Sequence, residues 1–153
     1  MMQSSVTTLA SLLERTFPAG LSGLIFDCDG VMVDSRDVNI GYYNLLLREV
    51  GKPPITPEQA GYVQMSTAKE ALEYIFSPEE LMPAIAERYP YRDVALPQLE
   101  LEPGLADMLH WLRERGVRLG IHTNRGSGMW DLLARFNLCE MFDPVMTAEI
   151  VPS

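Results

Sequence analysis

Two carboxylates stand two residues apart at the end of a short apolar run. Residues 24–26 have the composition of a strand buried on both faces, and Asp27, Cys28 and Asp29 follow directly. Side chains two positions apart at a strand end point the same way, so the carboxylates share one side and Cys28 takes the other. At about 4 Å apart they would repel by roughly 4 kcal/mol at an effective dielectric of ~20. Such a pair predicts a protonated carboxyl or a bound cation, and oxygen-only ligands favour Mg²⁺.

A second polar strand end follows much later in the chain. Residues 117–122 have the pattern of a strand and lead abruptly into Thr123. Ligands of open α/β sheets bind outside the carboxyl ends of the strands, so Asp27 and Thr123 are expected at the same edge of a parallel sheet. Gly30 allows a sharp turn after the carboxylates and exposes backbone N–H groups to a ligand. The sequence therefore predicts one ligand site formed by both strand ends.

Several of these residues also have ordinary structural explanations. Carboxylates after a strand commonly form turns or cap helices. Arg125 can meet a phosphate or cap the following helix, and the sequence leaves both interpretations open. Cys28 is interpreted as a small buried side chain rather than a nucleophile. His122 alternates with Thr123 along the strand and is therefore expected on the opposite side.

The long segment between the two strand ends, residues 37–100, is predicted to be helical and free of strands. Its first apolar stripe recurs at helical spacing and is closed by Gly51. Two capping-box patterns open later helices in it: Thr67 with Glu70, and Ser77 with Glu80. Residues 90–100 contain prolines and are expected to form an irregular return linker.

An α/β pattern flanks this segment on both sides. The expected elements are a short amphipathic helix over 6–17, the strand at 24–26, a helix from 105 to Gly116, the strand at 117–122, a helix over 127–136 and a short strand within 142–147. This order is that of an α/β fold interrupted by an all-helical module.

Composition excludes several classes of function. The 153 residues are 47% hydrophobic and 22% charged, which is typical of a globular domain. A formal net charge of −9 repels phosphate backbones and anionic lipid, so neither nucleic acid nor a membrane surface is an expected partner. The sequence shows no signal-peptide pattern and no apolar run near the ~18 residues of a membrane span. Two cysteines do not form a disulfide framework, and a cytoplasmic protein is expected.

The sequence FDCDGVMVDS at 26–35, combined with the stretch from 103 to 149 that contains Thr123, resembles the haloacid dehalogenase superfamily. It is most similar to the phosphoglycolate-phosphatase-like branch, whose members insert a helical cap after the first motif. The resemblance covers about residues 22–149. It implies an incomplete Rossmann-like parallel-sheet core, formed by residues 1–36 and 101–153, and an inserted all-helical cap over 37–100.

The resemblance also implies a role for each site residue. Asp27 corresponds to the nucleophile that forms an aspartyl-phosphate, and Asp29 to the acid that protonates the leaving group and then activates water. The Asp27 carboxylate and the backbone carbonyl of Asp29 correspond to the Mg²⁺ ligands. Thr123 corresponds to the residue that hydrogen-bonds the transferring phosphoryl group. The expected substrate contacts are Gly30, Thr123, Asn124 and Arg125.

These roles predict an Mg²⁺-dependent phosphomonoester hydrolase that acts on a small cytosolic phosphometabolite. Dehalogenases lack the second aspartate, so Asp29 favours phosphoryl transfer. Two alternatives stay open at this point. One is a phosphomutase of the same fold, and the other is a non-catalytic domain that binds a phosphorylated ligand or another protein.

Some family residues have no counterpart in this chain. The family requires a lysine after the second motif and then a further acidic metal site, whereas the two lysines here, Lys52 and Lys69, lie in the insert. Gln64 stands where relatives often carry glycine in a substrate-facing loop. We therefore expect a fragment, or a domain that has lost its catalytic completion, with little activity by itself. Its first strand is expected at a sheet edge, where it would pair with a second copy, swap elements or be covered by the N-terminal helix.

Overall fold

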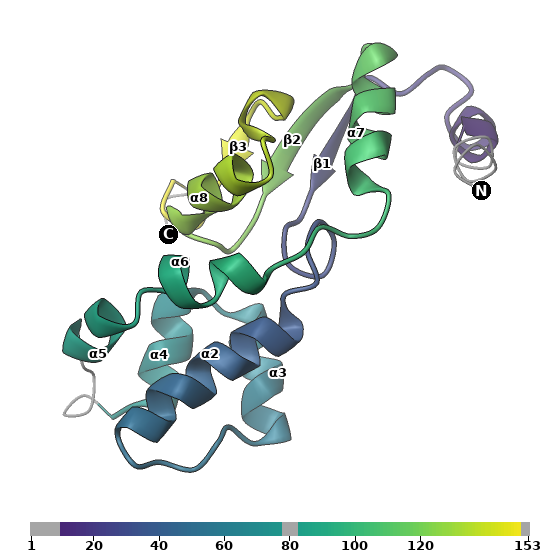
Figure 1. Ribbon diagram of the computed structural model, residues 1–153. Helices are drawn as coiled ribbons and strands as arrows, with labels where there is room; N and C mark the ends of the chain where they lie inside the picture. Colours follow the sequence, from purple (N-terminus) through teal and green to yellow (C-terminus); the bar gives the residue numbers. More distant parts are fainter. Residues whose placement is uncertain (1–9, 78–82, 151–153) are drawn as a thin grey trace.

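The core of the protein is a three-stranded parallel sheet. The structure is a computed structural model that describes residues 10–77 and 83–150 (Figure 1). The strands are β1 (Gly23–Phe26), β2 (Arg118–His122) and β3 (Val145–Met146), in the order β1-β2-β3. Phe26 pairs with Ile121, and Ile121 pairs with Val145. Because the strands are parallel, their carboxyl ends lie at one edge, and the predicted α/β fold is confirmed.

Two helices, α7 (Leu105–Glu114) and α8 (Gly128–Arg135), lie beside this sheet and form the first layer of the fold together with it (Figure 1). Their apolar side chains join those of the strands in one buried cluster that includes Leu109, Leu112, Leu119, Ile121 and Leu132. Complete burial of such a side chain stabilises the fold by about 1.5–3 kcal/mol. Gly120 permits the close approach of β3, because a Cβ atom there would lie 3.2 Å from the carbonyl oxygen of Pro144.

A second layer is helical, as the strand-free pattern predicted. It contains α2 (Arg36–Glu49), α3 (Pro57–Met65), α4 (Ala68–Ile75), α5 (Pro83–Arg88), α6 (Tyr91–Val94) and the 3₁₀ helix η1 (Leu96–Gln98). Figure 1 shows these helices gathered beyond the carboxyl ends of the strands. They have an apolar cluster of their own, which includes Tyr42, Leu46, Val63 and Ile75. The division of the chain into a core and a cap domain with boundaries at 36 and 101 stays a prediction.

Local sequence signals account for several helix ends. Thr67 accepts a hydrogen bond from the Glu70 backbone N–H while the Glu70 carboxylate accepts one from that of Thr67, so this capping box is confirmed. Thr56 and Gln59 form a second box of the same pattern, which the sequence analysis missed. The box predicted at Ser77 depends on Glu80, which lies outside the described residues. Gly51 ends α2 with a φ of +71°, a conformation that favours glycine.

One expectation for the backbone is wrong. Residues 90–100 are not an irregular linker, because they contain α6 and η1. Pro90 precedes α6 and Pro97 lies at the start of η1, and proline is well tolerated at the first turn of a helix. The short strand predicted within 142–147 is confirmed as Val145–Met146, and Pro144, which has no N–H to give to a ladder, precedes it.

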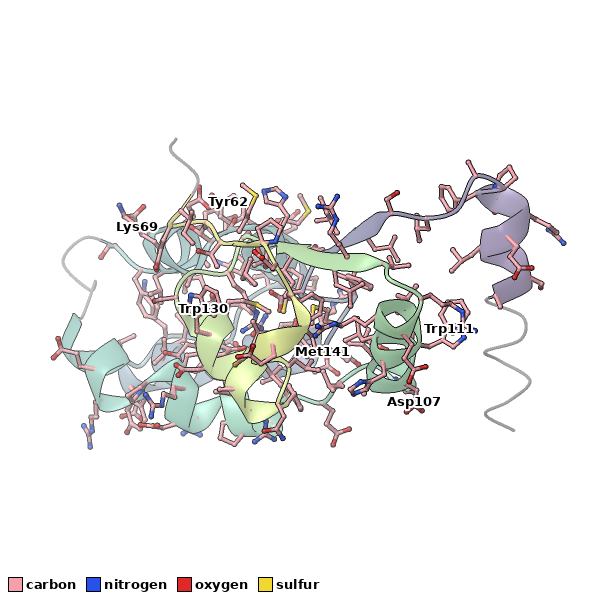
Figure 2. All side chains as sticks on the ribbon, turned by 90° about the horizontal axis from the view of Figure 1, so that it is seen from above. Tyr62, Lys69, Asp107, Trp111, Trp130 and Met141 are labelled. Atoms are coloured by element: carbon pink, nitrogen blue, oxygen red, sulfur yellow. The ribbon has the colours of Figure 1, made fainter. Side chains whose placement is uncertain are left out.

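Strand β1 lies at an edge of the sheet, as expected. The described part of the N-terminal helix, residues 10–16, borders a groove with Trp111 and Val117. Figure 2 shows Trp111 on the side of α7 that faces this helix. Ile25 of β1 remains 73% exposed, so the described helix does not cover this side chain. Among the described residues, no helix is long and apolar enough to cross a membrane.

Candidate active site

The ends of β1 and β2 open into one cavity of about 700 Å³, called here the strand-end cavity. The residues that line it include Asp27, Asp29, Gln64, His122, Thr123 and Asn124. The pairing of Phe26 with Ile121 explains this, because it brings the residues after the two strands side by side. Asp27, Asp29, Thr123 and Asn124 are therefore brought together. Their individual roles stay a prediction.

Asp27 is exposed to this cavity, and the residue after it faces the core. One carboxylate oxygen of Asp27, Oδ1, accepts a hydrogen bond of 2.7 Å from the backbone N–H of Cys28. The Cys28 side chain is completely buried, as predicted. Burial raises the pKa of the Cys28 thiol to about 12, so the thiol is neutral at physiological pH. The second Asp27 oxygen, Oδ2, has no hydrogen-bond partner among the described residues and is the one available to a ligand.

Asp29 forms a bidentate ion pair with Arg125. Arg125 Nε donates to Asp29 Oδ2 at 2.9 Å, and Arg125 Nη2 donates to Asp29 Oδ1 at 2.7 Å. The two side chains are only 13% and 12% exposed, respectively. Burial opposes the charge of Arg125, but the hydrogen bonds and the negative charge of Asp29 outweigh it and raise the pKa of Arg125 above its usual value. Arg125 therefore neither caps a helix nor stands free for a phosphate in this structure.

Thr123 and Asn124 hold the loop that follows β2. The Thr123 side chain is buried, and its Oγ1 accepts a hydrogen bond of 3.2 Å from the Arg125 backbone N–H. That geometry leaves the hydroxyl hydrogen of Thr123 for a ligand oxygen. Asn124 Nδ2 donates to the carbonyl oxygen of Ser66 at 3.1 Å, which joins this loop to the turn between α3 and α4.

Gly30 and His122 border the site at the ends of the two strands. Gly30 has a φ of +75°, which fits the predicted sharp turn. Its N–H donates to the carbonyl oxygen of Val33 at 2.9 Å, so this N–H is engaged within the protein. His122 was expected on the side opposite to Thr123, which agrees with the exposed side chain of His122 beside the buried one of Thr123, and both residues border the strand-end cavity. The cavity is broad enough to be bordered by an exposed and a buried side chain of neighbouring residues.

A second cavity of about 280 Å³, called here the inner cavity, lies beside the first. Residues in its wall include Asn39, Tyr42, Tyr43, Gln64, Tyr91 and Arg125. Asp29, Gln64 and Asn124 line both cavities. Tyr91 was not predicted as a site residue because residues 90–100 were expected to form a linker, and no sequence pattern indicated Asn39.

Tyr91 connects the helical layer to the ion pair. Its hydroxyl donates to Asn39 Oδ1 at 2.6 Å and accepts a hydrogen bond of 3.3 Å from Arg125 Nη2. The Arg125 guanidinium also lies 5.5 Å from the centre of the Tyr91 ring, which is within cation–π range. Asp29, Arg125, Tyr91 and Asn39 thus form one continuous polar chain from the sheet to α2.

The oxygen donors at the strand ends fit Mg²⁺ in kind. Mg²⁺ in phosphoryl-transfer sites is held by one or two carboxylates, with waters and the substrate completing the shell. The Asp27 carboxylate and the Asp29 backbone carbonyl supply such donors. The Asp29 carboxylate is engaged by Arg125. Within residues 10–77 and 83–150, no group of three or more His, Cys, Asp or Glu side chains is placed to hold a metal ion.

Comparison with known proteins agrees with this architecture. The family model for haloacid dehalogenase-like hydrolases matches residues 24–153. A probable pseudouridine-5'-phosphatase from Saccharomyces cerevisiae is 27% identical over 71% of this chain and 48% of its own length. A phosphoglycolate phosphatase from Pseudomonas putida is 30% identical over 73% of this chain and 45% of its own length.

Solved structures show the same relationship. The crystal structure of a haloacid dehalogenase superfamily hydrolase from Geobacter sulfurreducens has a TM-score of 0.66 and 32% identity, over 87% of this chain and 65% of that one. The chain spans about half the length of the two curated phosphatases from Saccharomyces cerevisiae and Pseudomonas putida. A family match across nearly the whole chain, on a parallel sheet with Asp27 and Asp29 at its carboxyl edge, places this protein in the haloacid dehalogenase-like hydrolase family.

Proposed function

We propose that this chain carries the nucleophile, the acid and the leaving-group pocket of a phosphomonoester hydrolase. The observation that carries the proposal is that Asp27, Asp29 and Thr123 line one open cavity at the carboxyl edge of the sheet. Family membership and the phosphatases among the relatives support it. The substrate class is a small phosphorylated metabolite.

In the first step, Asp27 Oδ2 attacks phosphorus and forms an aspartyl-phosphate while the bond from phosphorus to the leaving oxygen breaks. Asp29 gives its proton to that oxygen, and the Thr123 hydroxyl hydrogen-bonds a phosphoryl oxygen. In the second step, water attacks phosphorus, Asp29 takes the proton from the water, and Asp27 is released. A positioned acid–base group contributes about 10²–10⁴-fold to such a reaction. Mg²⁺ bound by the Asp27 carboxylate and the Asp29 carbonyl would offset the charge of the phosphoryl group.

The ion pair sets a condition on this chemistry. Both Asp29 oxygens accept hydrogen bonds from Arg125, so in this arrangement neither oxygen is placed to give a proton to the leaving group. The guanidinium must therefore release at least one oxygen, and that oxygen must take up a proton from solvent, before the first step. Arg125 lines the inner cavity, so a phosphate oxygen that reaches the guanidinium from that side would compete with Asp29 for its donors.

The test uses the complete gene product, because the chain spans about half the length of its curated relatives. Hydrolysis of p-nitrophenyl phosphate with Mg²⁺ is measured for the wild type, Asp27→Asn and Asp29→Asn. We expect no turnover for Asp27→Asn, and slow turnover or a trapped aspartyl-phosphate for Asp29→Asn. Asp107→Asn makes the same chemical change at an exposed position of α7 (Figure 2) and should leave the rate unchanged. Wild-type rates in the Asp27→Asn protein would overturn the mechanism.

One observation favours a second candidate function, a domain that binds a phosphorylated ligand without hydrolysing it. The Asp29–Arg125 pair removes the acid from use in the structure described here. Saturable binding of inorganic phosphate by a wild-type protein that does not hydrolyse p-nitrophenyl phosphate would support this candidate over the enzyme.

A further inference from the structure

The loop that follows β2 is held against the segment that follows β3. The backbone N–H of Thr123 donates to the carbonyl oxygen of Met146 at 3.0 Å, and that of Ala148 donates to the carbonyl oxygen of Arg125 at 3.0 Å. These two hydrogen bonds continue the parallel pairing of β2 with β3 beyond the ends of the strands. The backbone of the loop is therefore fixed at Thr123 and at Arg125, which both belong to the site.

Beyond Arg125, a side chain from the segment after β3 continues this attachment. Glu149 Oε1 accepts a hydrogen bond of 3.4 Å from the Ser127 hydroxyl, and its carboxylate lies against Gly126. Ser127 is the N-cap residue of α8, but among the described residues its hydroxyl makes no capping hydrogen bond to that helix and is used for Glu149 instead. The position also suits a carboxylate, because the start of a helix carries a partial positive charge.

Gly126 makes room for the glutamate. A Cβ atom at position 126 would collide with Glu149 Oε1, so any other residue there would displace the carboxylate. Gly126 does not have a positive φ, and the backbone at this position would accept alanine without strain. The glycine is therefore explained by the contact with Glu149 rather than by the conformation of the chain.

Resting on the proposed function, we infer that Glu149 is a positioning residue for the loop that carries Thr123 and Arg125. Glycines lie on both sides of Ser127, and glycine has the greatest backbone freedom of all residues. This part of the loop therefore depends on contacts from outside itself, and Glu149 supplies one. Displacement of a reacting group by about 1 Å can lower a rate about 10²-fold, so a looser loop should slow the chemical step.

The first test measures hydrolysis of p-nitrophenyl phosphate by the complete gene product with Mg²⁺. Glu149→Ala removes the carboxylate and should lower kcat about tenfold, with KM changed less than about threefold. Glu149→Gln keeps an oxygen that accepts from Ser127 and should keep kcat within about threefold of the wild type. Equal losses for the two variants would assign the effect to charge and overturn the inference. Glu114→Ala, at an exposed position of α7, is the matched control and should alter neither value.

Gly126→Ala tests the same contact from its other side. The added methyl group displaces the Glu149 carboxylate, so kcat should fall about as far as in Glu149→Ala. The double variant should be no slower than either single variant, because both substitutions remove one shared contact. Losses that multiply in the double variant would overturn the inference. Gly41→Ala is the control, since it lies at an exposed position of α2 where a Cβ atom would meet no described atom within 4 Å.

Hydrogen exchange separates failure of this inference from failure of the proposed function, because it requires no turnover. Nuclear magnetic resonance follows exchange at the amides of Thr123 and Arg125 in the wild type and in Glu149→Ala. Exchange about tenfold faster in the variant would show that the glutamate holds the loop. If the wild type then hydrolyses no phosphomonoester, the proposed hydrolysis fails and the positioning role stands. Unchanged exchange, or a lower free energy of unfolding with a wild-type kcat, overturns the inference.

Discussion

The sheet and the helical layer contribute to the site in different ways. The sheet places Asp27 and Thr123 through its backbone, since they are simply the residues that follow two paired parallel strands. The helical layer contributes Tyr91 and Gln64 through side-chain contacts that depend on how its helices pack. In this protein, the residues proposed for the chemistry directly follow strands of the sheet, and Gln64 and Tyr91 come from helices α3 and α6.

The largest effect should follow from a change on the sheet side of this comparison. Thr123→Val keeps the shape of the side chain and removes the hydroxyl that we place on the phosphoryl group. We expect kcat for p-nitrophenyl phosphate to fall about 10²–10³-fold, as for the loss of a donor that stabilises transition-state charge. Thr16→Val, on the exposed N-terminal helix, is the matched control. A wild-type kcat for Thr123→Val would show that the Thr123 hydroxyl does not act on the phosphoryl group.

The next effect concerns the ion pair that links the two strand ends. Arg125→Met leaves the Asp29 carboxylate largely buried without its partner, which should cost about 3–5 kcal/mol in the free energy of unfolding. Urea denaturation of Arg125→Met, Asp29→Asn and the double variant forms a thermodynamic cycle. The double variant should be less destabilised than the sum of the two single ones. Additive losses would mean that the pair is not coupled in solution.

A smaller effect is expected where the helical layer meets the core. Tyr91→Phe removes the hydroxyl between Asn39 and Arg125 but keeps the ring. Loss of one such hydroxyl should lower the free energy of unfolding by about 1 kcal/mol, with a few-fold change in KM. Tyr74→Phe on α4, where the ring is about half exposed, serves as the control. A KM that stays at the wild-type value would separate Tyr91 from the pocket.

The smallest effect on stability should come from the exposed strand edge. Ile25 is 73% exposed, so Ile25→Lys should change the free energy of unfolding by less than about 0.5 kcal/mol. A lysine on an edge strand also discourages pairing with another copy. If the 153-residue chain dimerises through β1, sedimentation should show a monomer for Ile25→Lys. A dimer that persists in this variant would exclude β1 as the interface.

Features that depend on local interactions were predicted from the sequence, and features that depend on contacts between distant segments were not. The strand ends and the helix boundaries at Thr67 and Gly51 depend on interactions within a few residues, and local patterns predicted them. The convergence of Asp27 with Thr123 also needed only the rule that parallel strands share an edge.

The rest of the site depends on contacts between distant segments. Nothing local to Arg125 indicates that it pairs with Asp29 rather than with a phosphate or a helix end. Tyr91 was not predicted as a site residue because the prolines near it were taken to indicate an irregular linker, although they lie at the starts of helices here. The buried Gln64 Oε1, which has no hydrogen-bond partner among the described residues, arises from the packing of α3 beside the core, which sequence periodicity does not report.

The burial of Cys28 has a consequence for the chemical durability of the site. Its sulfur is bracketed in sequence by the two aspartates, so an added oxygen or a mixed disulfide there would disturb both of them. Oxidants and electrophiles react with an accessible thiolate, and Cys28 has neither access to solvent nor a tendency to ionise. Cys139 is exposed and should react first with peroxide or iodoacetamide. The fold thus protects the Cys28 thiol from oxidation while leaving the neighbouring carboxylate of Asp27 open to solvent.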